Sequence, residues 1–455
     1  MHFKIGTRKK ISLKSFSVGI VVLSIPLGFA LETSSVSATT YYVSMTGSGS
    51  NSGTQTSPWL TIQQAADAMN AGDTVLVQAG TYPNRVATRR DGSDRAPITF
   101  RAQGKVVMNG FDLKNQYNIV DGFEITGNVT HPRGAAIAVS QSASYCQVLN
   151  NDIHDLDTSN EISGILLNGP AHCLVAGNGI KRPSFHCIII GGDSNVISNN
   201  WLEAPAGDGI RCFGFNQRIC NNVITNCHAT GNGQHPDLIQ SFAIHGSYAS
   251  NIVFESNYCV DSASQICQIS DDGSTGLVTN WTFRNNVFVR IGLQASIMFP
   301  GAKWYNNTFY RCNQVSGAVL GFGYDPAGRR GQSWRGEVKN NAFVECGPTI
   351  DDSKRGWHGA DARLKDFIAE YNYVGSSGGA PKARVDVRGN PMFSEAHGVN
   401  GGDPGFVSPS TGDFHLKSTS VLIDKGTPIP GFNSDFSGTT RPQGNGWDIG
   451  AFERR

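Results

Sequence analysis

The hexapeptide ISNNWL (residues 197–202) is followed 22 residues later by ICNNVI (219–224), and seven related hexapeptides occur elsewhere in the chain. In each of them, apolar or β-branched residues alternate on either side of a central pair, as in a short strand. The second residue of that pair is always asparagine: Asn151, Asn178, Asn200, Asn222, Asn257, Asn286, Asn307, Asn341 and Asn372. The chain is therefore built on an internal repeat.

The spacing of these asparagines indicates the fold. Successive members are 21 to 35 residues apart. The short intervals suit a parallel β-helix, in which each coil is a rung of short strands, and the longer ones suit insertions at the turns. A leucine-rich repeat has a similar period but needs regularly placed leucines, which this chain lacks. We predict an all-β, right-handed parallel β-helix, a solenoid of about ten coils, with the asparagines stacked as an inner ladder of amide hydrogen bonds.

Two pairs of cysteines keep the same register. Cys146 and Cys173 each lie five residues before the asparagine of adjacent rungs, and Cys312 and Cys346 each lie five residues after theirs. Neighbouring strands lie about 4.8 Å apart, which is within disulfide range. We therefore expect both pairs to be stacked, either as disulfides or as buried thiols.

The beginning of the chain has the features of an export signal. Residues 1–16 hold five Lys or Arg and no acid, an apolar run follows at 17–31, and small residues lead up to Ala38. This order predicts a secretory signal peptide over 1–38. The apolar run is short for a membrane span and contains Pro26. We expect a secreted protein, extracellular or periplasmic, that is monomeric and free of the membrane after cleavage.

Composition narrows the partners. Without residues 1–38 the chain carries 32 Lys and Arg against 35 Asp and Glu. This balance gives no support to nucleic-acid binding, which would favour a basic surface. Glycine is frequent, at 54 of 455 residues, as expected for a chain with many tight turns. The ten cysteines contain no C-x-x-C zinc pattern.

The segments at either end predict caps for the solenoid. Residues 61–69 predict an amphipathic helix that covers the open apolar end of the first coil, which otherwise exposes a sheet edge. We place the N-terminal cap and first coils at 39–110 and the β-helix with a groove at 111–375. Residues 376–455 are expected to form the C-terminal coils and cap, with short strands and turns over the last coil.

Several phrases resemble a known superfamily. YYVS, SPWLTIQQAADAMNAGDTVLVQAGTY, the Asn-Asn rungs and the closing DPGFV, DFHL, LIDKG and DIGAFE are similar to secreted right-handed β-helix proteins of the pectate-lyase-like superfamily. The resemblance covers nearly all of the chain after residue 38. It implies activity on polysaccharides, as a lyase, a glycoside hydrolase or an epimerase, although other members are phage tailspikes or adhesins.

The stretch QHPDLIQ (234–240) contains the most promising chemistry. From Asn200 to the strand that begins at Asp208 is eight residues, whereas from Asn222 to the strand that begins at Asp237 is 15. A seven-residue insertion therefore precedes the second strand. Inserted loops on a rigid solenoid commonly build its binding wall.

Alternation along the strands predicts which side chains point outward there. Asp208 and Asp237 begin their strands in one column, about 5 Å apart. Two outward columns should follow, one of Arg211, Gln240 and Gln268 and one of Phe213, Phe242, Ser270 and Phe299. Polar groups beside exposed aromatic rings suit a sugar chain. We expect Gln240, Gln268, Phe242, Phe213 and His245 to contact such a substrate.

The preferred reaction is β-elimination on a uronate-containing glycan. That reaction needs a base for the C5 proton and a positive charge near the carboxylate. His235 is the candidate base, and Arg211 is the candidate neutralising group or an alternative base. Asp208 and Asp237 complete the predicted catalytic set. A Ca²⁺ ion held by Asp208, Asp237 and the pair Asp271 and Asp272 is a further expectation.

Three alternatives remain open. A glycoside hydrolase needs two carboxyl groups, and Asp208 with Asp237 suits a retaining enzyme. A uronate C5-epimerase needs the same proton abstraction as the lyase. A glycan-binding or adhesin module would keep the polar surface but would have no chemistry to lose when His235 and Asp237 are replaced.

Overall fold

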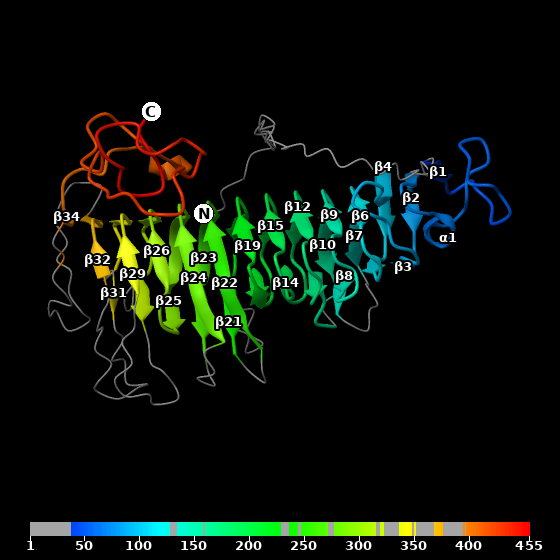
Figure 1. The fold of residues 1–455 in the computed structure, drawn as a ribbon, viewed down its shortest axis with the longest axis horizontal. Coiled ribbons are helices and arrows are strands. Elements are labelled where there is room, and N and C mark those ends of the chain that lie inside the picture. The colour runs from blue at the N-terminus through cyan, green and yellow to red at the C-terminus, as the bar shows by residue number, and fades with distance from the viewer. Residues whose placement is uncertain are drawn as a thin grey trace, which may run out of the picture. The chain divides into compact units, whose positions relative to one another are not determined.

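The computed structural model describes residues 38–127, 134–157, 160–228, 236–243, 247–271, 277–314, 319–322, 336–347, 350–351, 368–375, 395 and 397–455. All of them lie in one compact unit, Ser37–Arg455. The strands of the coils stack in parallel, each paired with the equivalent strand of the next coil (Figure 1), and one separate pair near the C-terminus is antiparallel. Within these ranges no helix is long and apolar enough to cross a membrane. The predicted parallel β-helix is confirmed.

The coils have three faces. Face I consists of β3 (Val86–Ala87), β5 (Phe111–Leu113), β8 (Ala135–Ser140), β11 (Ser163–Asn168), β14 (Ile188–Ile190), β17 (Ile210–Cys212), β21 (Asp237–Phe242), the end of β23 (Tyr258–Ser270), the end of β25 (Val287–Met298), β28 (Leu320–Phe322) and β31 (Ile350–Asp351). Face II consists of β1 (Thr40–Val43), β2 (Thr74–Tyr82), β4 (Ile98–Met108), β6 (Asn118–Asp121), β9 (Gln147–Leu149), β12 (Leu174–Ala176), β15 (Val196–Ser198), β19 (Arg218–Cys220), β22 (Ala249–Glu255), β24 (Val278–Arg284), β26 (Lys303–Tyr305), β29 (Glu337–Lys339) and β32 (Ile368–Glu370). A short strand, β18 (Gly214–Phe215), leads into face II and pairs with β22.

Face III contains the ends of β2 and β4 and the beginnings of β23 and β25. Its other strands are β7 (Glu124–Gly127), β10 (Asp152–Leu156), β13 (Gly179–Lys181), β16 (Trp201–Glu203), β20 (Val223–Thr225), β27 (Thr308–Tyr310), β30 (Ala342–Val344), β33 (Tyr373–Gly375) and β34 (Val399–Asn400). Buried and less buried residues alternate along strands such as β6 and β10, whereas strands such as β8 and β21 are buried at almost every position.

The repeated asparagines form the expected ladder at the turn between faces II and III. Each amide nitrogen donates to the amide oxygen of the next rung, at 2.9–3.1 Å, from Asn151 to Asn372. The backbone N–H of each donates to the same oxygen. The residue before each of them has a positive φ, as at Asn199 (57°) and Asn221 (56°), and asparagine tolerates that conformation well. Both halves of the Asn-Asn repeat therefore have a structural cause.

The cysteine register is also confirmed. Pairing of Leu174 with Gln147 places Cys173 against Cys146, and pairing of Tyr310 with Val344 places Cys312 against Cys346. All ten cysteines of the chain are buried free thiols, so the pairs are thiol stacks. Burial raises the pKa of the Cys173 thiol to about 12, which suppresses the reactive thiolate.

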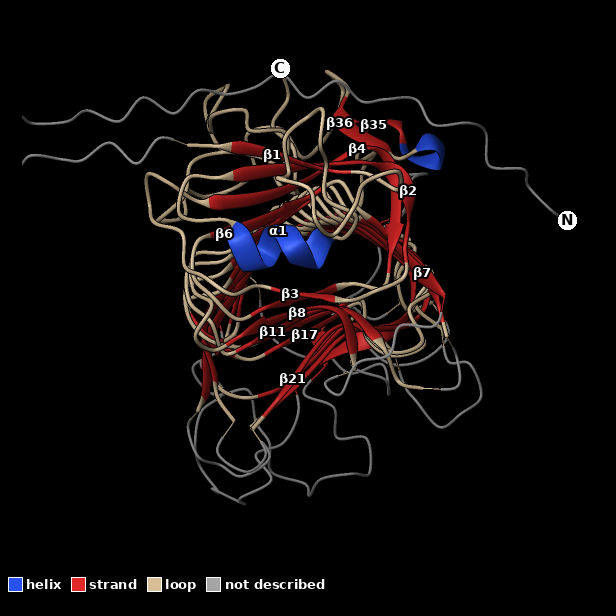
Figure 2. Cartoon of the chain, turned by 90° about the vertical axis from the view of Figure 1, so that its right-hand side faces the viewer, coloured by secondary structure: helices blue, strands red, loops and turns tan. Residues whose placement is uncertain are grey.

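The predicted helix is α1 (Ile62–Ala68). Thr61 caps it, accepting a hydrogen bond from the backbone N–H of Gln64, whose side chain in turn accepts from the backbone N–H of Thr61. Ile62, Ala65 and Ala66 are buried. Figure 2 views the coils from their N-terminal end and shows α1 lying across their interior. The helix therefore covers the first coil, as predicted.

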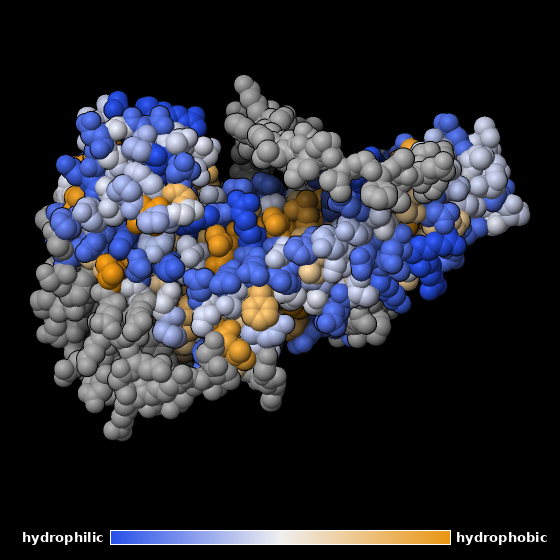
Figure 3. Space-filling model, in the orientation of Figure 1, coloured by the Kyte–Doolittle hydropathy of each residue, from blue (hydrophilic) through white to orange (hydrophobic). Residues whose placement is uncertain are grey.

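The C-terminal segment differs from the prediction. Residues 403–455, including β35 (Phe406–Ser408), the 3₁₀ helix η1 (Pro409–Thr411) and β36 (Asp413–Leu416), do not lie over the last coil. They pack beside the coils (Figure 1), and Phe406, Phe414, Leu422 and Phe452 form one cluster with outward residues of face III. Those outward residues are Val287, Val289, Tyr310, Ala342, Val344 and Tyr373. The surface that this segment presents in Figure 3, at the upper left, is mainly hydrophilic.

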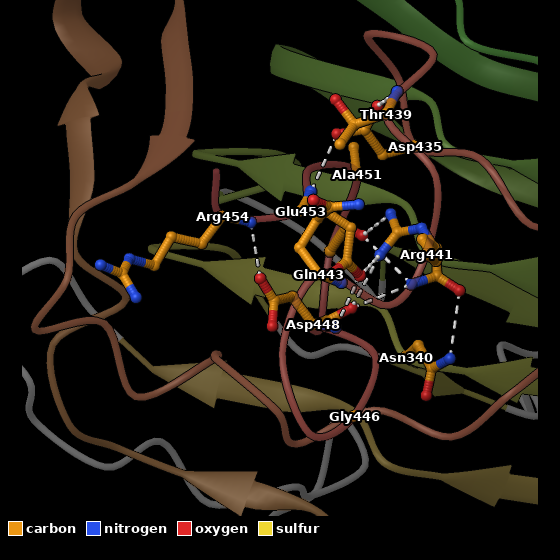
Figure 4. A network of polar contacts seen from close by, with 12 residues as sticks. Asn340, Asp435, Thr439, Arg441, Gln443, Gly446, Asp448, Ala451, Glu453 and Arg454 are labelled. Carbon is orange, nitrogen blue, oxygen red and sulfur yellow. Dashed lines mark hydrogen bonds and ion pairs between the residues drawn. The ribbon is translucent and has the colours of Figure 1, made fainter.

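Polar contacts anchor this segment to the first members of three Asn-Asn pairs. Asn285 donates to the Ser434 carbonyl at 2.7 Å, and Asn306 donates to the Asp448 carbonyl at 3.1 Å. Asn340 donates to the Thr427 carbonyl at 2.8 Å. In Figure 4 the buried Arg441 lies at the centre of this region, where it pairs with Glu453 at 2.7 Å and donates to the carbonyls of Asp448 and Gly450.

Asp448 makes this anchorage sensitive to pH. It is buried, and its carboxylate accepts the backbone N–H groups of Asp424 and Arg454 at 2.8 and 2.7 Å. Burial raises the pKa of Asp448 from 3.8 to about 6, although these two N–H groups oppose the shift.

We expect Asp448→Asn to change how stability depends on pH. Because the pKa of Asp448 is higher in the folded than in the unfolded protein, its stabilising effect is complete below about pH 4 and is lost as pH rises through about 6. Over this window the free energy of unfolding should change by roughly 2–3 kcal/mol in favour of the variant, measured by urea unfolding. Asp67→Asn, at an exposed aspartate, is the control. If the difference in unfolding free energy between Asp448→Asn and the wild type did not vary with pH, the prediction would be contradicted.

Candidate functional site

The register of face I brings the predicted residues together. Ile210 pairs with Ile239, Arg211 with Gln240, and Gln240 with Gln268, so the first outward column is confirmed. The residues of opposite parity, Ile210, Cys212, Ile239, Ser241, Cys267 and Ile269, are buried as expected.

One rung departs from the predicted register. Ser270 pairs with Met298, so Phe299 is not in the second outward column. Phe299 is instead buried among the core aromatics, with its ring 6.4 Å from that of Trp281. The cause is an irregularity between Ser262 and Gln265, where the pairing of β23 with β25 shifts by one residue. Phe213 and Phe242 do neighbour each other, edge to face at 5.2 Å.

Asp208, Arg211, Gln240 and Asp237 form one hydrogen-bonded network. Arg211 donates from Nε and Nη2 to Asp208 Oδ2, at 2.9 and 2.8 Å. The same Nη2 donates to Gln240 Oε1 at 2.6 Å, and Gln240 Nε2 donates to Asp237 Oδ2 at 3.0 Å. The backbone N–H of Asp237 closes the circuit by donating to Asp208 Oδ1 at 3.0 Å.

The surroundings of Gln240 differ from those expected of a residue that contacts a substrate directly. It is only 3% exposed, and both ends of its amide are used by protein partners. These contacts make Gln240 a link between Arg211 and Asp237.

The two carboxyl groups have unequal surroundings. Asp208 accepts hydrogen bonds from the guanidinium of Arg211, whereas Asp237 accepts from the neutral amide of Gln240. Burial first, and the Asp208 carboxylate second, raise the pKa of Asp237 well above its ordinary value. These surroundings favour the protonated form of Asp237 beside an Asp208 carboxylate that is paired with Arg211.

His186 continues the same column on the preceding rung. Its Nδ1 accepts the backbone N–H of Asp208 at 2.8 Å, so the proton of the neutral ring is on Nε2. Burial, and then the charge of Arg211, lower the pKa of His186 to about 2, so its 3.3 Å contact with Asp208 Oδ2 is not an ion pair. A Cβ on Gly207 would lie 2.6 Å from His186 Nδ1, which explains the glycine there. His186 positions Asp208.

Arg211 is the member of the network that reaches the surface. Its side chain is 21% exposed, whereas those of His186 and Asp208 are nearly fully buried. The guanidinium carbon lies 5.8 Å from the ring centre of Phe185 and 5.4 Å from that of Phe242. Its Nη1 has no hydrogen-bond partner among the residues that the structure describes. The role of Phe185 was not predicted, although it directly precedes His186 in the sequence.

Gln268 is the second available polar group. It is half-buried, lies in register with Gln240, and its amide has no partner within the described ranges. Arg211 and Gln268 thus present open hydrogen-bonding groups two rungs apart on face I.

Three predicted site residues, His235, His245 and Asp272, lie outside the described residues. Asp271 is described and is buried. Where the structure describes the chain, no group of three or more His, Cys, Asp or Glu side chains could hold a metal ion. The predicted Ca²⁺ site includes Asp272, which lies outside the described residues, so this site stays a prediction; the carboxylate of Asp208 is already engaged by Arg211.

Replacing Asp237 tests this distribution of charge. We expect Asp237→Asn to change the free energy of unfolding by less than about 1 kcal/mol, because an amide resembles the protonated acid and its oxygen can still accept from Gln240 Nε2. Asp208→Asn should lower the free energy of unfolding by about 2 kcal/mol more than Asp237→Asn does, because it removes the anion that neutralises Arg211. Chemical unfolding of both variants at neutral pH provides the comparison. Equal losses would show that Asp237 is ionised as well.

Comparison with known proteins agrees with this architecture. Residues 41–247 match a family model described as a Pel9A-like, right handed beta helix region. That match spans the N-terminal coils and the strands that carry Asp208, Arg211 and Asp237. This match, over somewhat less than half of the chain, confirms the predicted resemblance to the pectate-lyase-like superfamily of right-handed parallel β-helix proteins.

Similar proteins cover different shares of the chain. Pectate lyase L of Dickeya dadantii is 23% identical, over 91% of this chain and 90% of that protein. The uncharacterized protein YwoF of Bacillus subtilis is 31% identical, over only 26% of this chain and 29% of its own length.

Solved structures share the fold. The complex of XylC with xylose has a TM-score of 0.57 at 12% identity, covering 91% of this chain and 99% of XylC. Pectate lyase Pel9A has a TM-score of 0.53 at 18% identity, and the match covers 93% of this chain and 98% of Pel9A.

Proposed function

We propose that the chain is an exported polysaccharide-active enzyme that cleaves a uronate-containing glycan by β-elimination. The observation that carries this proposal is Arg211, a partly exposed cation held by Asp208 and Gln240, whose Nη1 has no hydrogen-bond partner within the described ranges. The relative named pectate lyase L, which aligns over most of the chain, supports the same reaction class.

In this proposal Arg211 binds the uronate carboxylate. A positive charge there stabilises the negative charge that develops when the C5 proton is removed. The electron pair of the C5–H bond then forms the C4–C5 double bond, and the C4–O bond to the neighbouring sugar breaks. Arg211 is poorly suited to be the base itself, because an arginine paired with a carboxylate keeps its proton. His235, on the insertion before β21, is the proposed base.

A glycoside hydrolase is the second candidate, and the protonated Asp237 favours it. A hydrolase needs one carboxylic acid and one carboxylate, and Asp237 with Asp208 supplies that pair of states. Both groups are almost fully buried, which places them behind Arg211 and favours the lyase.

Product analysis separates these candidates. Purified protein is incubated with polygalacturonate, with alginate and with a neutral glycan such as xylan. Ultraviolet absorbance from an unsaturated uronate on the acidic polymers is expected from the lyase. New reducing ends without that absorbance would establish hydrolysis, and neither signal on any polymer would favour a glycan-binding module.

A further inference from the structure

The outward column of face I changes character at Arg211. On its C-terminal side lie Gln240, Gln268 and Ser296, which are polar. On its N-terminal side the in-register neighbours are Ile189 and then Leu166. Strand pairing therefore places two apolar side chains directly beside the candidate carboxylate-binding group.

Ile189 and Leu166 are accessible at these positions. Both are half-buried, whereas the residues on either side of them in β14 and β11, such as Ile188 and Ile165, are buried. Phe185 extends the apolar surface, because its ring packs near the guanidinium of Arg211 at 5.8 Å. This surface, formed by Leu166, Ile189 and Phe185, is named here the apolar subsite.

The spacing of the rungs relates the apolar subsite to a sugar chain. Paired strands are separated by about 4.8 Å, which is close to the length of one pyranose residue in a glycan. A chain lying along the column therefore places roughly one sugar on each rung. With a uronate over Arg211, the next residue lies over Ile189 and the following one over Leu166.

We propose that the apolar subsite selects a glycan in which the sugar next to the bound uronate carries a methyl group. Hydroxyl groups placed over Ile189 and Leu166 would lose water without gaining hydrogen bonds, which is unfavourable. A methyl group there buries apolar surface instead. Two kinds of sugar supply it, a 6-deoxyhexose and a methyl-esterified uronate. The proposal rests on Arg211 binding a uronate, as in the proposed function.

Binding to the His235→Ala variant, which lacks the proposed base and is expected to leave the oligosaccharides uncleaved, tests this without depending on the reaction. Isothermal titration calorimetry compares three probes of equal length: unsubstituted oligogalacturonate, galacturonate alternating with rhamnose, and partly methyl-esterified oligogalacturonate. We expect one of the methyl-bearing probes to bind about 10-fold or more tightly than the unsubstituted one. Preference for the rhamnose probe identifies the 6-deoxyhexose, and preference for the esterified probe identifies the ester.

Variants assign the preference to the subsite. Ile189→Gln and Leu166→Gln should each bring the affinity for the preferred methyl-bearing probe close to that for the unsubstituted probe. Ile189→Val should keep most of the difference between the two affinities. The matched control is Leu174→Gln, at a half-buried outward leucine on face II. Equal affinity of the His235→Ala protein for all three probes, or a preference that both glutamine variants retain in that background, would overturn the inference. Methyl-dependent binding without unsaturated products from the wild type would refute the lyase proposal and keep the subsite.

Discussion

Arg211→Ala is expected to lower kcat/KM on the cleaved uronate polymer by about 10²- to 10³-fold. Removal of one group that stabilises developing negative charge typically has an effect of this size. The structure favours the upper part of the range, because Asp208 and Gln240 fix the guanidinium before any substrate binds. Initial rates of unsaturated product formation measure the effect. Arg211→Lys should restore only part of it, since lysine keeps the charge but loses the planar fork.

Arg211→Ala also leaves Asp208 buried without its cation, which should lower the free energy of unfolding by about 3 kcal/mol. The double variant Asp208→Asn with Arg211→Met removes both charges and should regain most of that stability without regaining activity. Arg182→Ala, which breaks an exposed pair with Asp155, is the control and should affect neither property by much. Full activity of Arg211→Ala in a folded protein would exclude Arg211 from the reaction.

Asn222→Ala is expected to lower the free energy of unfolding by about 3–5 kcal/mol. The Asn222 amide oxygen accepts from both the backbone and the side chain of Asn200, and its nitrogen donates to the Ile197 carbonyl and to Asn257. Truncation leaves several of these buried groups unsatisfied, each at about 1–3 kcal/mol. Chemical unfolding followed by circular dichroism measures the loss.

The adjacent residue provides the control for this prediction. Asn221 is exposed and has a φ of 56°, so Asn221→Gly should be nearly neutral, since glycine adopts that conformation without strain. Similar losses for Asn222→Ala and Asn221→Gly would indicate that the turn conformation, rather than the ladder, stabilises the coil.

Much of the site could be predicted because the repeat fixes the register. Once Asn200 and Asn222 are aligned, strand alternation places Arg211 beside Gln240 and Asp208 beside Asp237. The same reasoning fails at Phe299, because a one-residue irregularity near Ser262 reverses the side to which each later residue points.

Other features depend on contacts that no repeat encodes. The C-terminal segment meets the coils through pairs such as Asn285 and Arg441, which are 156 residues apart in the sequence. Its apolar residues give no sign of which surface they will cover. The burial of Gln240 was also missed, because outward parity says nothing about partners that close over a side chain.

The asparagine ladder also has a polarity. Every amide in it donates toward the C-terminal end, so the individual dipoles add along the axis of the coils. The first oxygen, on Asn151, accepts the backbone N–H of Phe123, and the last donors, on Asn372, are directed at the carboxylate of Glu395, with the backbone N–H at 2.6 Å. A negative group thus lies at the positive end of the array, as anions do at the N-terminus of a helix. The carboxylate of Glu395 therefore compensates the positive end of the ladder. If a further asparagine rung were added after Asn372, an equivalent negative group would be needed next to that new last rung.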